Sequence, residues 1–140
     1  MRFELVTLDG TKFSEEVHEI VLPTPQGYIG VFTNHMPLVS IATPGVISVR
    51  HKESDHDDHM EHFATNGGVI EVADNTVRVL VDEADKDSEI NEAEARKAYE
   101  QAQKLRAEAK SQLELDKAQS MIDRSAVRLH VASLKRRHHR

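Results

Sequence analysis

Hydrophobic and polar residues alternate in short runs through the first 82 residues of the chain. Residues 3–8, 17–23 and 76–81 are rich in β-branched and aromatic side chains, which is typical of strands. The dipeptides Asp9-Gly10 and Asp74-Asn75 fall between such runs and favour tight turns. The pattern predicts roughly eight to ten short strands in about 80 residues, at the spacing of a small β-sandwich built from two packed sheets.

The stretch from 25 to 45 is the most sharply turned part of the predicted sandwich. It holds six of the ten Gly and Pro residues of the chain, placed between short apolar runs. This arrangement is typical of strands separated by tight turns. Farther along, residues 46–51 and 62–65 are predicted to pair as a hairpin, with the polar segment 52–61 as their connection.

The composition changes after Asp82, because no Gly or Pro occurs beyond Gly68 and strong helix formers follow. Residues 89–110 consist mainly of Ala, Glu, Lys, Arg and Gln, and either Ser88 or Asn91 can cap the start of a helix. A second amphipathic segment follows. We therefore predict a β-sandwich domain over residues 1–84 and a two-helix hairpin over residues 85–140.

The apolar faces of the two predicted helices are narrow. They consist of Ala95, Ala98, Ala102, Leu105 and Ala109 in the first helix and Ala118, Ile122, Ala126 and Leu129 in the second, with Val127, Val131 and Leu134 a little off that line. Segment 111–116 is the only plausible bend, and nothing in it opposes a continuous helix. Because narrow faces bury little apolar surface, the hairpin has only a modest advantage over one long helix. We predict a bistable element whose arrangement depends on the partner it contacts.

The 140 residues contain no cysteine, which excludes disulfide bonds and thiolate chemistry. No apolar run approaches the roughly 20 residues that a membrane-spanning helix needs. The first residues also lack the apolar segment of a signal peptide. We therefore expect a soluble protein without direct membrane insertion, which reaches a membrane only through a partner.

The formal charge of −6 is unevenly distributed along the chain. Residues 1–82 carry 13 Asp or Glu against 5 Lys or Arg, whereas residues 83–140 carry 11 against 13 and end in a basic tip at 135–140. An acidic body repels nucleic acid, and an aromatic content of 4% is too low for a base-stacking surface. The basic tip therefore favours an acidic protein surface as its partner, and no nucleic acid is expected.

The polar segment 51–62 contains the most concentrated group of potential metal ligands. His56, His59 and His62 lie among acidic residues and could bind Zn²⁺ or Ni²⁺ through imidazole and carboxylate groups. Their three-residue spacing spreads the ligands instead of converging them, so a solvated hairpin loop is the simpler interpretation. We expect no metal and no cofactor, and keep a metal-binding β-domain as the alternative function.

His35 is a candidate general base. No nucleophile or orienting carboxylate accompanies it in the sequence, so a packing or contact role in a turn fits this residue better. The chain also has no phosphate loop, paired carboxylates or catalytic triad. We therefore do not expect an enzyme, and a third alternative is an adaptor that self-associates through its helices.

Several motifs occur in an order that resembles one known family. They are Gln26-Gly27-Tyr28-Ile29-Gly30-Val31, Asn34-His35-Met36-Pro37-Leu38, Pro44-Gly45-Val46-Ile47 and Asn66-Gly67-Gly68-Val69-Ile70-Glu71-Val72. With the Ala-rich helical pair behind them, they resemble the epsilon subunit of bacterial and chloroplast-type F1Fo ATP synthase. The resemblance covers essentially the whole chain.

This resemblance implies a ten-stranded β-sandwich followed by a helical hairpin, in a non-catalytic subunit of the central stalk. It implies that the sandwich binds the gamma subunit and the c-ring and turns with the rotor, coupling proton flow to ATP synthesis. It also implies that the helices can leave the hairpin and inhibit ATP hydrolysis at the alpha and beta subunits. The implied location is peripheral, at the cytoplasmic face of the bacterial inner membrane or, alternatively, at the thylakoid membrane.

The same resemblance implies a set of contact residues. Those expected near the c-ring and the base of gamma are Tyr28, Gly30 and His35. Those expected to make the inhibitory contacts are Arg124, Arg128, Lys135, Arg136 and Arg137.

The chain departs from the family at one motif and in the His/Asp-rich segment 51–62, which resembles no feature of the family. Some members bind ATP through an I-D-x-x-R-A motif at the start of the first helix, and the matching positions here include Ile90, Asn91 and Glu94. An amide replaces the acidic residue, and a carboxylate replaces the arginine, which reverses the field that a phosphate group would meet. We therefore do not expect this chain to sense ATP.

Overall fold

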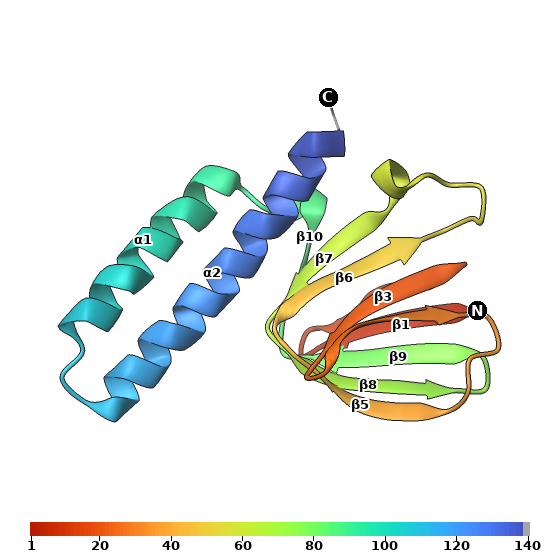
Figure 1. Cartoon of the computed structure of the whole chain (residues 1–140), viewed down its shortest axis with the longest axis horizontal. Helices are drawn as coiled ribbons and strands as arrows, with labels where there is room; N and C mark the ends of the chain where they lie inside the picture. Colours follow the sequence, from red (N-terminus) through yellow and green to blue (C-terminus); the bar gives the residue numbers. More distant parts are fainter. Residues whose placement is uncertain (139–140) are drawn as a thin grey trace.

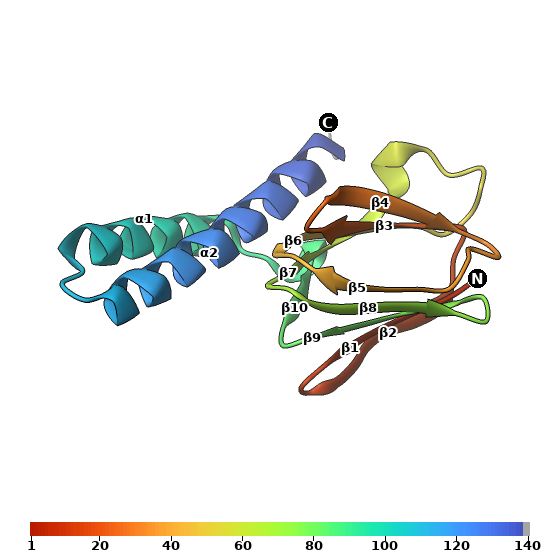
Figure 2. The same cartoon turned by 60° about the horizontal axis from the view of Figure 1, so that its bottom comes forward.

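The structure of the chain, a computed structural model, describes residues 1–138, with side chains as far as Arg136 (Figure 1). Ten strands form two five-stranded sheets, and two helices follow them. The two sheets face each other as layers (Figure 2). This arrangement confirms the predicted β-sandwich followed by a helical hairpin.

The first sheet has the strand order β2-β1-β9-β8-β5, and the second has the order β10-β7-β6-β3-β4. The first contains β1 (Arg2–Thr7), β2 (Gly10–Glu16), β5 (Leu38–Ala42), β8 (Gly68–Ala73) and β9 (Thr76–Val81). The second contains β3 (Glu19–Thr24), β4 (Gly27–Phe32), β6 (Gly45–Arg50), β7 (Glu61–Thr65) and β10 (Ala84–Lys86). Strand β1 pairs with β9 in parallel, which a hairpin cannot achieve, so strands far apart in the sequence become neighbours.

The hairpin between β8 and β9 confirms the predicted turn at Asp74-Asn75. Both residues have a positive φ, 51° and 56°, which suits the tight turn of a two-residue hairpin. The second glycine of the Gly67-Gly68 pair opens β8, and there is a steric reason for a glycine at this position. A Cβ at Gly68 would overlap the carbonyl group of Leu80 on the neighbouring strand, so any other residue would push β8 away from β9.

The largest side chains in the core between the two sheets are almost completely buried. Phe3 and Leu5 come from the first sheet, and Ile20 and Phe63 come from the second. The ring of Phe13 lies 5.4 Å from that of Phe3 and 5.5 Å from that of Phe63, so aromatic contacts connect the sheets. Among the residues with described side chains, neither helix contributes to this core, so the burial between the two sheets does not depend on the helices.

Helix α1 (Glu92–Glu108) and helix α2 (Gln112–His138) form an antiparallel hairpin beside one end of the sandwich (Figures 1 and 2). Asn91 caps α1, because its Oδ1 accepts a hydrogen bond from the Glu94 N–H at 3.1 Å. The predicted apolar positions that are buried include Ala95, Ala102, Ala118 and Ile122. No helix within residues 1–138 is both long and apolar enough to cross a membrane.

Two predicted positions on the apolar faces are wrong. Leu105 is 49% exposed, and Ala126 is also exposed. In the C-terminal half of α2, Val131 is buried as predicted, and Ser125 and Ala132 are buried although they were not predicted. The face of α2 therefore changes along its length, because this half of the helix contacts the sandwich as well as α1.

The connection between the helices has a local cause that the sequence analysis missed. Ser111 Oγ accepts a hydrogen bond from the Glu114 N–H at 3.1 Å, and the Glu114 carboxylate accepts one from the Lys110 N–H at 2.8 Å. These reciprocal contacts resemble a capping box, which favours a new helix start. The expectation that nothing in segment 111–116 opposes a continuous helix was therefore wrong.

Helix α2 lies against the outer face of the second sheet through a small apolar cluster, which we call the docking cluster. Its buried members are Val46 on β6, Ala64 on β7 and Val131 on α2, bordered by Ile90, Val127 and Leu134. This cluster is separate from the core between the sheets and contains far fewer side chains. The hairpin is thus attached to the sandwich by a limited apolar contact.

Candidate partner interfaces

Four apolar side chains form a row across the outer face of the first sheet. In the strand register Ile41 lies opposite Val69, Val69 opposite Leu80, and Leu80 opposite Val6. Ile41 is 62% exposed, Val69 44% and Leu80 43%. We call these four residues the apolar row, and they line a shallow groove of about 620 Å³.

A charged row runs beside the apolar row, two residues along each strand. Glu71 lies opposite Arg78, and Arg78 Nε donates a hydrogen bond to Glu4 Oε2 at 3.0 Å. At the edge of the sheet, Val39 lies opposite Glu71 and is 75% exposed. An exposed apolar strip bordered by paired charges is typical of a surface that binds another protein.

The end of the sandwich away from the helices carries the turn between β4 and β5 (Figure 2). The Asn34 N–H donates a hydrogen bond to Asn75 Oδ1 at 2.8 Å, which joins this turn to the turn between β8 and β9. His35, one of the predicted contact residues, lies here with its Nδ1 2.7 Å from the carbonyl oxygen of Met36. Met36 is 73% exposed, so this end presents an apolar side chain among polar turns.

The other two predicted contact residues of the sandwich lie elsewhere along β4. Tyr28 is at the start of this strand, 58% exposed, and its hydroxyl accepts a hydrogen bond from the Val46 N–H at 3.1 Å. Gly30 lies in the middle of the strand beneath the ring of Phe32. His35 follows the opposite end of β4, so the structure does not bring these three residues together.

Two of the predicted inhibitory residues, Arg124 and Arg128, lie one turn apart on α2. Both face the segment that joins the sandwich to α1. Arg124 forms an ion pair with Glu83, and Arg128 Nε lies 3.7 Å from Asp85 Oδ2. These arginines are therefore occupied by acidic residues of the same chain while the hairpin is docked.

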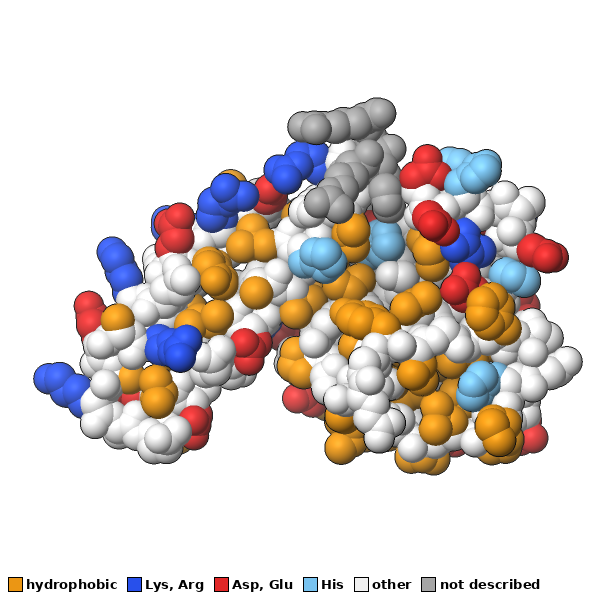
Figure 3. Space-filling model, viewed as in Figure 1, with side chains coloured by type: hydrophobic (Ala, Val, Ile, Leu, Met, Phe, Trp, Pro, Cys, Tyr) orange, Lys and Arg blue, Asp and Glu red, His pale blue; other side chains and the backbone are white. Residues whose placement is uncertain are grey.

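The remaining predicted inhibitory residues lie at the end of α2. Arg136 Nη1 donates a hydrogen bond to Glu92 at 2.8 Å, Lys135 is half-buried, and the side chain of Arg137 lies outside the described part of the chain. No acidic residue follows Asp123 in the sequence, so the last part of α2 carries only positive charges. In Figure 3 most of the Lys and Arg side chains on the visible face lie along the helices.

The positions that depart from the ATP-binding motif have other structural roles. Asn91 caps α1, and Ile90 borders the docking cluster. Glu94 lines a hollow of about 310 Å³ between the helices, together with Arg124 and Arg128. The hollow thus contains a carboxylate as well as two guanidinium groups, which weakens its field for an anionic ligand.

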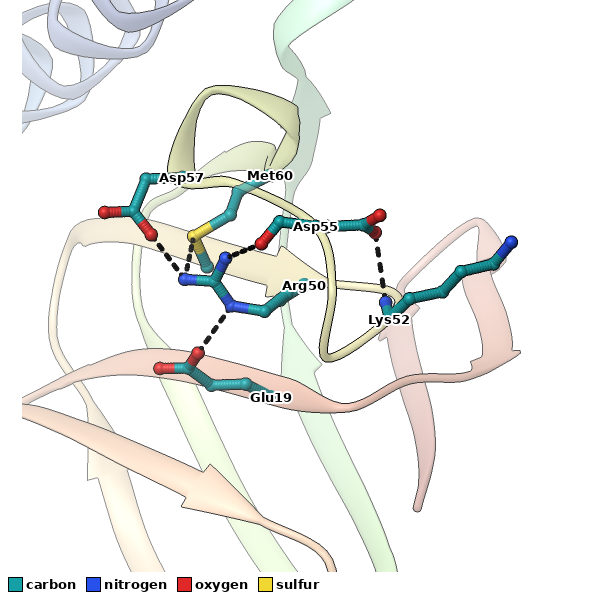
Figure 4. A network of polar contacts seen from close by, with 6 residues as sticks. All are labelled: Glu19, Arg50, Lys52, Asp55, Asp57 and Met60. Atoms are coloured by element: carbon teal, nitrogen blue, oxygen red, sulfur yellow. Dashed lines mark hydrogen bonds and ion pairs between the residues drawn. The ribbon is translucent and has the colours of Figure 1, made fainter.

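The connection between β6 and β7 is organised by Arg50, which the sequence analysis did not single out (Figure 4). Its Nε donates to Glu19 Oε2 at 2.9 Å, its Nη1 to the carbonyl oxygen of Asp55 at 2.5 Å, and its Nη2 to Asp57 Oδ1 at 2.5 Å. The hydrogen bond from Arg50 and its positive charge lower the pKa of Asp57. A lone arginine directly before an acidic segment is the sequence signal that could have found it.

The three histidines considered as weak metal ligands do not share one site. His56 and His59 are exposed, with ring centroids 6.3 Å apart. His62 is buried on β7, and its Nδ1 lies 2.8 Å from Ser48 Oγ. The three-residue spacing therefore spreads these side chains over different surroundings.

A different group, Glu15, His51 and Glu61, places three potential ligand atoms within 4.8 Å of one another. The two carboxylates approach different ring nitrogens, Glu61 at 2.9 Å from Nε2 and Glu15 at 3.9 Å from Nδ1. Lys86 Nζ also lies 3.0 Å from Glu61. Burial alone would raise the pKa of Glu61, but hydrogen bonds from His51 and Lys86 outweigh it and lower this pKa. The group fits an ion-pair cluster between the sheets better than a metal site.

The sequence matches two consecutive family models. Residues 1–87 match the β-sandwich domain of the ATP synthase delta/epsilon chain, and residues 88–133 match its long α-helix domain. The chain is 35% identical to the chloroplastic ATP synthase epsilon chain of Adiantum capillus-veneris, over 87% of this chain and 89% of the relative. It is 33% identical to the ATP synthase epsilon chain of Herpetosiphon aurantiacus, over 97% of this chain and 96% of the relative.

Two solved structures share the fold. A chain in the mitochondrial ATP synthase of Euglena gracilis, solved as an OSCP/F1/c-ring assembly, has a TM-score of 0.78 at 22% identity, over 94% of this chain and 79% of that one. A chain in the central stalk and c-ring of the Tetrahymena thermophila mitochondrial ATP synthase has a TM-score of 0.58 at 17% identity, over 96% of each chain. At these identities the two structures support the fold alone.

Proposed function

This chain belongs to the ATP synthase delta/epsilon chain family, as an epsilon-type subunit, and we propose that it couples proton flow to ATP synthesis as part of the rotor. The observation that carries the proposal is the match over both parts of the chain, the sandwich and the helices. The sandwich, residues 1–84, attaches the subunit to the stalk. The helices, residues 85–140, regulate ATP hydrolysis.

The outer face of the first sheet is the surface that we assign to the gamma subunit. Its apolar row is exposed over three strands and lies beside a row of paired charges. A partner that covers this row removes apolar side chains from water, while the charges at its border remain solvated or paired. The epsilon subunit thereby turns with gamma and remains non-catalytic.

The end of the sandwich away from the helices is the surface that we assign to the c-ring. His35 and Met36 lie there, next to the turn at Asp74-Asn75. Tyr28 and Gly30 lie farther along β4, so we assign them to contacts nearer to gamma. The location that follows is peripheral, on the bacterial inner membrane at its cytoplasmic face or on the thylakoid membrane.

The inhibitory role is assigned to the basic face of α2. Its positive charges come from Arg124, Arg128, Lys135, Arg136 and Arg137. No acidic residue follows Asp123 in the sequence, so this part of the helix carries no negative charge of its own. When the helices leave the sandwich, these charges become available to acidic surfaces on the alpha and beta subunits. The contact obstructs the catalytic cycle in the hydrolysis direction.

A shortened chain tests the proposal in the assembled ATP synthase. It ends after Asp87 rather than at residue 84, because β10 pairs with β7 and belongs to the second sheet. We expect this variant to assemble and support proton-coupled synthesis, while ATP hydrolysis in membrane vesicles increases. The full-length variant Lys135→Ala/Arg136→Ala/Arg137→Ala should give part of the same increase. Unchanged hydrolysis in both variants would remove the inhibitory role and leave a passive stalk subunit.

A further inference from the structure

Two acidic residues at the junction between the sandwich and α1 occupy the arginines of α2. Glu83 directly precedes β10, and Asp85 lies within it. Glu83 pairs with Arg124, and the Asp85 carboxylate lies 3.7 Å from Arg128 Nε. Because the arginines are one helical turn apart, both contacts form or break together when α2 moves.

The Arg128–Asp85 contact is partly shielded from water. Only 29% of the Arg128 side chain and 24% of the Asp85 side chain are exposed. Arg128 Nε itself is buried and makes no hydrogen bond within the described residues. Its charge is balanced mainly by the nearby carboxylate, and partly buried charges interact more strongly than fully solvated ones.

The apolar contribution to docking is small, so these charges have a large share in the equilibrium. The docking cluster has only three buried members, Val46, Ala64 and Val131, and all of them have small or medium-sized side chains. At the junction, Glu83 and Asp85 contact α2 through Arg124 and Arg128. A few ion pairs can therefore decide whether the docked or the free arrangement predominates.

We propose that Glu83 and Asp85 form an internal latch, an acidic substitute within the chain for the acidic partner surface, which holds Arg124 and Arg128 while the hairpin is docked. The inference rests on the proposed function, in which the same arginines meet the alpha and beta subunits. Inhibition requires α2 to leave the sandwich, and this movement separates the two arginines from Glu83 and Asp85. Docking and inhibition therefore exclude each other. The latch needs no bound ligand, because its acidic half belongs to the chain.

The latch predicts opposite effects for its two halves in the assembled enzyme. Glu83→Gln/Asp85→Asn releases the arginines without altering them, so ATP hydrolysis should fall below that of the native enzyme. Arg124→Gln/Arg128→Gln also opens the latch but removes the inhibitory charges, so hydrolysis should rise. The proposal would be overturned if both variants changed ATP hydrolysis in the same direction.

The isolated full-length chain provides a test that is independent of inhibition. Because it has no cysteine, spin labels can be attached at Thr11→Cys on β2 and Lys117→Cys on α2, two exposed positions. We expect Glu83→Gln/Asp85→Asn to increase the population at long label distances by about three- to tenfold. The control Glu100→Gln/Glu108→Gln removes two exposed carboxylates of α1 that make no ion pair in the described structure, and should not change this population.

Salt and charge exchange make the isolated-chain test specific. Raising NaCl from about 50 mM to about 500 mM should open the native chain by screening the ion pairs, and should affect the neutralised variant less. Glu83→Arg combined with Arg124→Glu should restore most of the docked population, whereas each single change should lower it. The latch would be overturned if Glu83→Gln/Asp85→Asn and the control showed the same population at long label distances. It would also be overturned if Glu83→Arg with Arg124→Glu did not restore the docked population. Such a result would leave the proposed function intact if the shortened chain still raises hydrolysis.

Discussion

The sandwich and the helical hairpin are stabilised in different ways. The sandwich buries large side chains such as Phe3, Ile20 and Phe63 completely between its sheets. The hairpin buries mainly alanines where its helices meet and contacts the sandwich through the small docking cluster and ion pairs. The sandwich is thus built for one arrangement, whereas the docking of the hairpin is a balance that a partner can change.

The first prediction sharpens this contrast through the core. Phe63→Ala removes a fully buried ring that contacts Phe13, so the free energy of unfolding should fall by about 3–5 kcal/mol. Urea unfolding of the full chain measures the change. The control Phe32→Ala removes a ring that is 48% exposed and should cost less than about 1 kcal/mol. Equal costs would contradict the description of the sandwich as the rigid part.

This core was largely predictable from the sequence, because strands that bury one face have a recognisable pattern. The turn at Asp74-Asn75 and the hairpin around segment 52–61 followed from local residue types alone. The apolar row could not be predicted in this way, although the sequence shows each of its residues. It requires the registers of four strands and the parallel pairing of β1 with β9, which bring Val6 beside Leu80. Local patterns carry no information on which distant strands become neighbours.

The second prediction weakens the docking of the hairpin and leaves the sandwich unchanged. Val131→Ala removes two buried methyl groups from the docking cluster, which should cost about 1.6 kcal/mol of docking. Hydrogen exchange should show faster exchange in α2 and unchanged protection in the sandwich strands. The control is Gln103→Ala on the exposed face of α1, because alanine is a strong helix former and this side chain does not contact the docking cluster. Loss of protection in both parts would show that the two regions unfold as one unit.

The contacts of the hairpin were less accessible to sequence analysis than its helices. The helix formers and the Asn91 cap predicted α1 correctly, but Ser111 and Glu114 were not recognised as the residues that end the continuous helix. The basic residues Arg124 and Arg128 were found through the family resemblance. Their acidic partners were not, because Glu83 lies 41 residues before Arg124 in the sequence. Glu83 and Asp85 become neighbours of the two arginines only when α2 folds back. Charge in a sequence shows what can pair but not with which residue.

The last and smallest effect concerns the partly exposed ion-pair cluster of Glu15, His51 and Glu61 on the sandwich. Glu61 has a lowered pKa in the folded chain, since the hydrogen bonds from His51 and Lys86 exceed the opposing effect of burial. Its carboxylate form therefore stabilises the fold at a pH above the ordinary glutamate pKa of about 4.3, and this contribution disappears as the pH falls through the lowered value. Glu61→Gln should cost less than about 1 kcal/mol at pH 7, because the group is partly solvated. The difference in unfolding free energy between the native chain and this variant should shrink steadily as urea unfolding is repeated from pH 6 down to pH 3.

A difference that is constant over this range would assign the effect to packing. It would also mean that charge pairs contribute to stability at the hairpin and not in the sandwich, where the apolar core already determines the arrangement.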